Sequence, residues 1–315
     1  MKRLLYISAF LCAAAACTKS GLPAGGGYPA DGVVRISPTV AAPVTRAEGS
    51  TEYGGSRLGL GLYYGENDKY NRPSSLWRKD KDGNWTTSGA QVLWKDAETE
   101  VAVYAFVPYE ESDNSDFYTN RAFNVSVPTD QSDGLDAADA LWYLEKVKPE
   151  EALDQDGKLH IELKHALLKM TVNLTYGNEF GDEKPSVKEV WLNGTWGDVI
   201  CSLSEEGRLF AIGFSSVDIR MRKVSENCYE AIFYPSTGQK AGGDALTVVF
   251  ADGKDYHMTL SEDLNFVKDS NGGYLGGCAY SMTVQVGKNK IQLENVDITP
   301  WQESPSSNLE AEEKN

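Results

Sequence analysis

Apolar and polar residues alternate in short runs along most of the chain, which is the periodicity of β-strands rather than of helices. Five runs are the clearest: Leu58/Leu60/Leu62, residues 100–109, Phe123/Val125/Val127, Leu159/Ile161/Leu163 and Met170/Val172/Leu174. The run at 100–109 is apolar on both faces and therefore predicts a central strand. Residues 135–147 leave open whether they form a short helix or a strand after a loop.

Turn signals separate these runs at regular intervals. Asp82-Gly83 predicts a tight turn, and Asp252-Gly253 predicts a hairpin between two alternating runs. Residues 287–290 (GKNK) separate the last two predicted strands in the same way. Because no βαβ alternation or sustained helical amphipathicity accompanies them, the pattern predicts an all-β fold of the β-sandwich type.

Length and composition suggest two such domains. The chain has 315 residues, of which 41% are hydrophobic, and this excludes wholesale disorder. We predict one β-sandwich over residues 47–166 and a second over residues 167–301. Residues 302–315 contain four Glu and a single large apolar residue, Leu309, and are expected to form an acidic flexible tail.

The N-terminus has the features of an export signal. Residues 1–16 combine a basic start, an apolar stretch too short to span a bilayer, and small residues directly before Cys17. This ending resembles the lipobox of bacterial lipoproteins, in which the cysteine thiol receives a diacylglyceryl group and becomes the mature N-terminus. The alternative is that Cys17, like Cys12, is one more residue of the apolar stretch.

Residues 17–46 are predicted to be a lipidated linker that also contains a first edge strand. Three apolar residues share one face of a period-two pattern here: Val34, Ile36 and Val40. Pro38 lies within the same run and restricts it to the edge of a sheet. The following stretch is small and polar, and it carries Arg46.

Charge excludes one class of partner. The chain has 30 Lys and Arg against 46 Asp and Glu, a formal charge of −16, whereas nucleic-acid binding requires a basic face. Removal of residues 1–16 takes away two basic residues and leaves −16 − 2 = −18. No later segment has the roughly 18–20 apolar residues of a membrane helix, so lipid is the expected means of membrane attachment.

The sequence has no pattern typical of an enzyme, a cofactor site or a metal site. It lacks a nucleophile elbow, a P-loop and a dinucleotide-binding fingerprint. The remaining candidate side chains have no ligand-like spacing: His160, His165, His257, Cys201, Cys228 and Cys278. The three cysteines form at most one disulfide, and free thiols buried in strands are the expected state.

Several motifs, taken in order, resemble those of the fimbrillins, the subunits of type V pili of certain double-membraned anaerobic bacteria. The shared segments are Thr45-Arg46-Ala47, Asn84-Trp85, VYAFVPY at 103–109, DQS at 130–132, DALW at 139–142, LKHALLKM at 163–170 and ITPW at 298–301. With the lipobox, the resemblance extends from Cys17 to Trp301.

The resemblance implies two tandem transthyretin-like Greek-key β-sandwiches and a role in building or anchoring an adhesive surface pilus. It implies transport to the outer membrane as a lipoprotein, followed by Arg-specific cleavage between Arg46 and Ala47. That cut would remove the lipid together with the first strand, and the vacated groove would accept a strand from another pilus subunit. A host or bacterial surface ligand is a further candidate partner.

The C-terminus departs from this pattern. A donor strand should alternate apolar residues, and residues 302–315 do not. Either the donor is the segment from Ile291 to Ile298, or the protein is an anchor, tip or accessory component rather than a repeating stalk subunit. The alternative function is a surface lipoprotein that binds a glycan or host protein and never polymerises.

Overall fold

The computed structural model describes residues 27–41, 51–109, 122–203, 209–236, 244–259, 266, 274 and 276–301. The predicted signal peptide 1–16, Cys17, the Arg46-Ala47 bond and the tail 302–315 lie outside these residues. Within them, the helical elements are α2 (Pro149–Ala152) and the 3-10 turn η2 (Asn178–Phe180), and neither approaches the length needed to cross a membrane. The all-β prediction is confirmed, whereas the transthyretin-like Greek-key topology stays a prediction.

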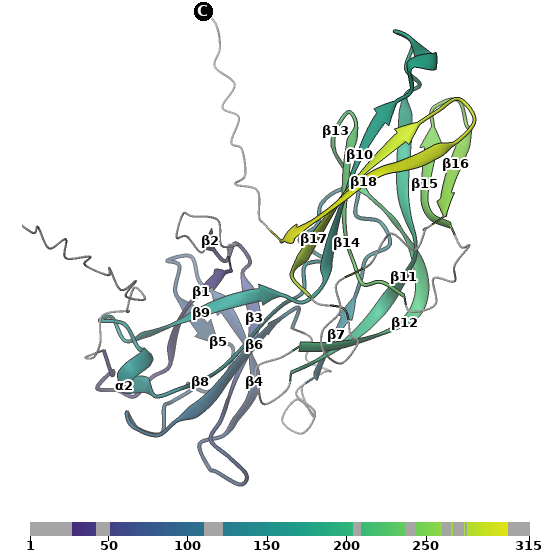
Figure 1. Ribbon diagram of the computed structural model, residues 1–315. Coiled ribbons are helices and arrows are strands. Elements are labelled where there is room, and N and C mark those ends of the chain that lie inside the picture. Colours follow the sequence, from purple (N-terminus) through teal and green to yellow (C-terminus); the bar gives the residue numbers. More distant parts are fainter. Residues whose placement is uncertain are drawn as a thin grey trace, which may run out of the picture.

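The strands form two units that lie side by side (Figure 1). The first unit contains β1 (Arg35–Val40), β2 (Thr51–Glu52), β3 (Arg57–Tyr63), β4 (Arg72–Lys79), β5 (Trp85–Thr87), β6 (Val101–Val107), β8 (Leu141–Val147) and β9 (Lys158–His165). The second contains β7 (Ala122–Ser126), β10 (Leu168–Tyr176), β11 (Val187–Leu203), β12 (Leu209–Arg220), β13 (Arg222–Ser225), β14 (Cys228–Phe233), β15 (Asp244–Phe250), β16 (Asp255–Thr259), β17 (Cys278–Val286) and β18 (Ile291–Pro300).

In the first unit the strands follow one path, β2-β1-β9-β8-β6-β3-β4-β5. The contact between β8 and β9 is limited to two residue pairs, Leu141 with His165 and Trp142 with Lys164, so the path bends there into two layers. The alternating apolar residues of both layers meet in one core, where Leu60 and Ile161 are almost completely buried. β1, next to one end of the path, and β5, at the other end, therefore come close to each other.

The second unit has two facing sheets, β13-β14-β10-β17-β18 and β12-β11-β15-β16. Met170 and Val172 of β10 and Val190 of β11 lie in the same buried cluster, as expected for a sandwich filled from both inner faces. The predicted hairpin at Asp252-Gly253 is present as β15 and β16. Residues 135–147, left undecided by the sequence, form a loop followed by β8.

One strand crosses the predicted boundary between the domains. β7, at Ala122–Ser126 in the first half of the sequence, pairs with residues 198–202 of β11 in the second unit. Phe123 and Val125 of β7 are buried in the core of that unit. The two halves of the sequence are therefore joined by a strand ladder as well as by the chain itself.

Candidate functional site

β1, the strand predicted to be a removable propeptide strand, is part of the first unit. It pairs with β9 in parallel over six residues, from Arg35 opposite Lys158 to Val40 opposite Leu163. Val34, Ile36 and Val40 are 3%, 4% and 3% exposed and face the core. The three residues named from the sequence thus lie together on one face; their removal by cleavage stays a prediction.

Pro38 does not interrupt β1, because its missing N–H is on the outer edge of the strand. The Ala41 N–H donates to Leu163 of β9, whereas the Pro38 carbonyl accepts from the Tyr53 N–H on the opposite side. Successive residues of a strand alternate between its two edges, so Ile36 has both backbone groups on that outer edge. Among the described residues, the Ile36 N–H and C=O have no partner there.

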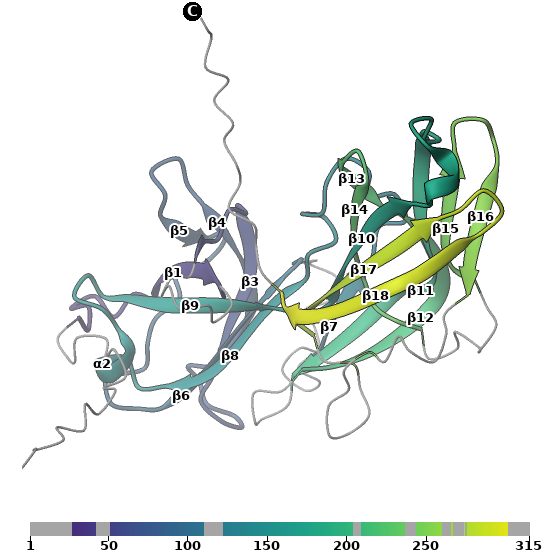
Figure 2. The same ribbon diagram turned by 45° about the horizontal axis from the view of Figure 1, so that its top comes forward.

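A groove of about 460 Å³ opens beside this edge, between β1 and β5. We call it the seam; it is lined by residues 33–38, 83–87, 89, 91 and 92 together with Glu52, Trp77 and Lys158. Figure 2 shows β1 lying between β9 and β5. On the far rim, Thr86 pairs with Arg78 of β4, so the backbone groups of Trp85 and Thr87 face the seam.

Both ends of the seam are closed. At one end the Val34 N–H donates to the Val92 carbonyl at 3.0 Å, so the chain after β5 pairs directly with the residue before β1. At the other end Tyr53 stacks on Trp85, with ring centroids 5.9 Å apart. Burial raises the pKa of Tyr53 to about 12, so its hydroxyl stays neutral and donates to the Arg57 carbonyl.

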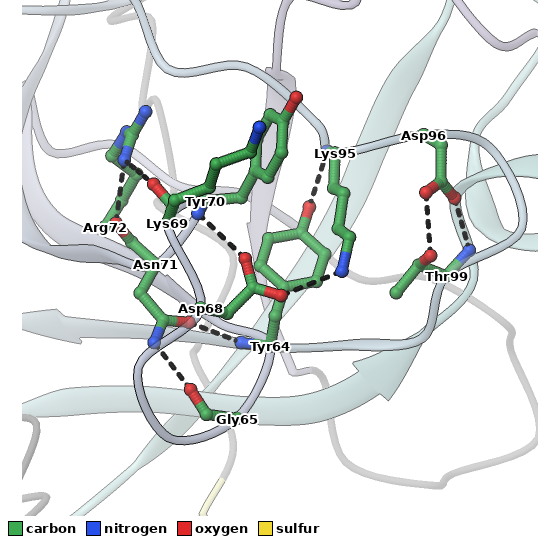
Figure 3. Close-up of polar contacts among 10 residues, drawn as sticks. All are labelled: Tyr64, Gly65, Asp68, Lys69, Tyr70, Asn71, Arg72, Lys95, Asp96 and Thr99. Atoms are coloured by element: carbon green, nitrogen blue, oxygen red, sulfur yellow. Dashed lines mark hydrogen bonds and ion pairs between the residues drawn. The ribbon is translucent and has the colours of Figure 1, made fainter.

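A separate polar network ties the β3–β4 loop to the segment before β6 (Figure 3). The Lys95 ammonium lies 2.8 Å from the Asp68 carboxylate, and the hydrogen bond between them holds the pKa of Asp68 below its ordinary value. The Lys95 backbone N–H donates to the Tyr64 hydroxyl, and the Asn71 amide donates to the Gly65 carbonyl. Since these groups bind one another, the network stabilises the loop rather than presenting groups to a ligand.

The two units meet at a buried aromatic stack. His165, the last residue of β9, lies parallel to Trp301 with ring centroids 3.9 Å apart, and its Nδ1 is 2.8 Å from the Asp139 carboxylate. The Trp301 N–H donates to the Gly277 carbonyl. Trp301 is 5% exposed, so this residue, directly after β18, is fixed against the end of β9.

Histidines and cysteines do not gather into a site in the described part of the chain. No group of three or more His, Cys, Asp or Glu residues suited to a metal occurs there. His160 pairs with Asp154, and His257 with Asp244 and Asp255. Cys201, Cys228 and Cys278 are free thiols in strands, and burial raises the pKa of Cys201 to about 12, so this thiol is unreactive.

Sequence reasoning missed the seam. Asn84-Trp85 was recognised as a motif, but its position opposite β1 depends on how the eight strands curl, which local periodicity does not encode. Cys17, Arg46 and Ala47 lie outside the described residues, so lipidation and cleavage stay predictions.

Comparison with known proteins agrees with this architecture. The chain matches two solved candidate cell adhesion proteins, one from Bacteroides uniformis ATCC 8492 at 17% identity and TM-score 0.59, covering 86% of this chain and 100% of the other. The second, from Bacteroides ovatus ATCC 8483, has 14% identity and TM-score 0.57, covering 87% and 99%. The tip fimbrial protein Mfa3 from Porphyromonas gingivalis, with a C-terminal truncation, has 12% identity and TM-score 0.47, covering 85% and 100%.

No curated protein matches the chain significantly. The match to a family is more extensive, because residues 44–301 fit the family described as Fimbrillin-like. This range contains every strand of both units except β1. The chain therefore belongs to the fimbrillin-like family, as its motifs implied.

Proposed function

We propose that the chain is a structural component of an adhesive cell-surface pilus, and that it joins neighbouring subunits by β-strand addition at the position of β1. The observation that carries the proposal is the place of β1: it is the first described strand, it lies near the open end of the sheet path, and Arg46 follows it in the sequence. Assembly and adhesion, rather than catalysis, are the proposed activities.

The apolar surface that β1 buries favours replacement of β1 by another strand over its removal alone. Burial of Val34, Ile36 and Val40 contributes roughly 1.5–3 kcal/mol each before ordering costs. Loss of β1 would expose this apolar surface and the edge of β9, a template for pairing with another chain. An incoming strand with apolar residues at alternate positions would restore both the backbone hydrogen bonds and the buried contacts.

The predicted lipidation and cleavage sites suggest an order of events for this exchange. Cys17 would carry the lipid that holds the uncleaved protein at the outer membrane. Cleavage between Arg46 and Ala47 would cut the chain between β1 and β2. It would release the subunit from the lipid and leave β1 held to the subunit by non-covalent contacts alone. Exported subunits would thereby become competent for assembly only at the cell surface.

The test is the mass of the protein isolated from surface filaments of the producing cell. We expect a species that begins at Ala47 and carries no lipid. Arg46→Lys should keep the charge but block an Arg-specific cut and keep the protein out of filaments, whereas Arg57→Lys, at the exposed start of β3, should behave like the unmodified chain.

A lipidated species beginning at Cys17, present in membranes and absent from filaments, would instead favour the surface lipoprotein that binds a glycan or host protein. Immunogold labelling of cells separates the remaining possibilities, because a stalk subunit lies along filaments, a tip protein at their ends and an anchor at their base.

A further inference from the structure

We infer that the seam is a binding site for an acidic sugar, namely a single pyranose ring that carries a carboxylate, such as a uronic or sialic acid residue of a glycan. The inference deepens the proposed adhesive role, on which it rests for its biological setting, by naming a class of ligand. Binding itself requires β1 in place but neither cleavage nor polymerisation. The uncleaved full-length chain is therefore the protein to test.

The shape of the seam suits a compact molecule. Its volume of about 460 Å³ lies within the range of small-molecule sites in proteins, roughly 300–1,000 Å³. The hydrogen bond from Val34 to Val92 closes one end, and the hydrogen bond from Tyr53 to Pro38 closes the other. An extended segment cannot pass these two contacts, whereas a single ring that enters from the open side of the groove need pass neither.

Both rims of the seam present backbone groups that have no partner in the described part of the chain. On β1 these are the N–H and C=O of Ile36. On β5 they are those of Trp85 and Thr87, because the Ser88 N–H donates to the Leu76 carbonyl and this alternation leaves Trp85 and Thr87 on the outer edge. A sugar hydroxyl both donates and accepts hydrogen bonds, so a ring between the rims can pair with N–H and C=O groups alike.

The side chains of the lining combine polar groups with an apolar surface. Thr86 and Gln91 are exposed, and their side chains have no hydrogen-bond partner among the described residues. Trp85 and Val92 are 8% and 5% exposed and supply the apolar part of the wall. A pyranose has hydroxyls around its edge and C–H groups on its two faces, so it is recognised by polar groups beside the ring and an apolar surface against one face. The seam therefore suits a sugar better than a wholly apolar ligand.

One cation without a partner favours an acidic sugar over a neutral one. Two of the charged residues that line the seam are already neutralised. Arg35 pairs with Asp31 at 2.6 Å, and Glu52 pairs with Lys79. The ammonium of Lys158, the third, has no ion-pair or hydrogen-bond partner in the part of the chain that the structure describes. A carboxylate on the bound ring would pair with this ammonium, and such charge-assisted hydrogen bonds are stronger than neutral ones.

Titration of the full-length chain with sugars, followed through its amide NMR signals, measures both the affinity and the position of binding. The probes are glucuronic acid and N-acetylneuraminic acid, and glucose is the neutral control. At least one acid should bind roughly tenfold or more tightly than glucose, because only an acid pairs with the Lys158 ammonium. The amides of Ile36, Trp85 and Thr87 should shift, and that of Ile298 in the second unit should not. The tighter of the two acids distinguishes a uronic from a sialic acid ligand.

Variants of Lys158 separate a specific ion pair from the general effect of charge. Lys158→Gln should abolish the preference for the acid over glucose, and Lys158→Arg should retain most of it. Lys146→Gln, at an exposed position of β8, is the matched control and should bind like the unmodified chain. Because Lys158→Gln leaves Arg46 and the apolar residues of β1 intact, this variant should still enter filaments. Sugar binding and the proposed function can therefore fail independently.

Four results would overturn the inference. One is the absence of any shift at the seam amides with an excess of either acid. The second is equal affinity of the unmodified chain for the acids and for glucose. The third is an unchanged preference for the acid in Lys158→Gln. The fourth is a set of shifts centred outside the seam, because the sugar would then bind elsewhere on the molecule.

Discussion

Two glycines of β3 make room for aromatic rings of the neighbouring strand. A Cβ atom at Gly61 would overlap the ring of Tyr104, and one at Gly59 would overlap Tyr109 and Phe106. In the sequence these glycines only separate the alternating leucines of β3, and nothing local explains why the intervening positions are so small. In the structure, the rings of Tyr104 and Phe106 on β6, and of Tyr109 just after it, pack directly against the backbone at these glycines.

Gly61→Ala is therefore expected to lower the free energy of unfolding by about 1–3 kcal/mol, because Tyr104 must leave its rotamer or the strands must separate. Gly89→Ala is the matched control, since a Cβ there meets no atom within 4 Å. Urea denaturation measures both. Equal midpoints for the two variants would contradict the packing role assigned to Gly61.

Cys17 is the residue on which the proposed membrane attachment depends. Cys17→Ser removes the thiol that the lipobox interpretation assigns to the diacylglyceryl group, so incorporation of labelled palmitate into the protein should be lost. Cys12→Ser, within the predicted signal peptide, should leave incorporation intact. Undiminished labelling of Cys17→Ser would show that the lipobox interpretation is wrong.

At the scale of elements, the apolar side chains of β1 that pack into the core of the first unit all lie on one face of the strand. Val40→Asp places a carboxylate in the core and should loosen β1, so that amides of β9 exchange faster than in the unmodified chain. Thr39→Asp, on the opposite face of β1, is the control and should have a much smaller effect. Unchanged β9 protection in Val40→Asp would mean that β1 contributes little to this edge.

β18 and the residue that follows it close the second unit. A chain that ends after Trp301 should melt within a few degrees of the full protein, because residues 302–315 have too little apolar surface to offset roughly 1–2 kcal/mol of backbone ordering per residue. A chain that ends after Val296 loses the Trp301–His165 stack and the last ladder pairs, and should be markedly destabilised. Equal melting of both truncated chains would contradict the role of Trp301.

Local sequence signals predicted individual strands better than their partners. The β15–β16 hairpin could be predicted because its turn, Asp252-Gly253, and both alternating runs are contiguous. The parallel pairing of Thr39 with Glu162 joins residues more than a hundred positions apart, and no periodicity specifies it. The same limit applies to β7, whose alternation was evident but whose partner in β11 was not. The seam depends on the pairing of β1 with β9 and on the contact of Val34 with Val92, which are both distant in sequence. Local patterns therefore could not predict it.

At the scale of the whole molecule, charge opposes association. Residues 1–46 contain five basic residues and one acidic residue, so cleavage after Arg46 changes the formal charge from −16 to −16 − 4 = −20. Copies of the cleaved chain repel one another, and salt screens this repulsion. Polymerisation of the cleaved protein, followed by light scattering, should accelerate as ionic strength rises. Slower polymerisation in salt would indicate that opposite charges on the two contact surfaces dominate.

A surface fibre is placed under tension whenever the cell that bears it is pulled, and β7 determines how this chain would transmit such a force. The polypeptide passes between the two units three times: from β6 to β7, from β7 to β8, and from β9 to β10. A single linker would act as a swivel and concentrate the whole pull on one peptide segment. Three crossings share the applied force, and the hydrogen bonds between β7 and β11 oppose rotation of one unit against the other. The two units should therefore respond to force as one rigid body.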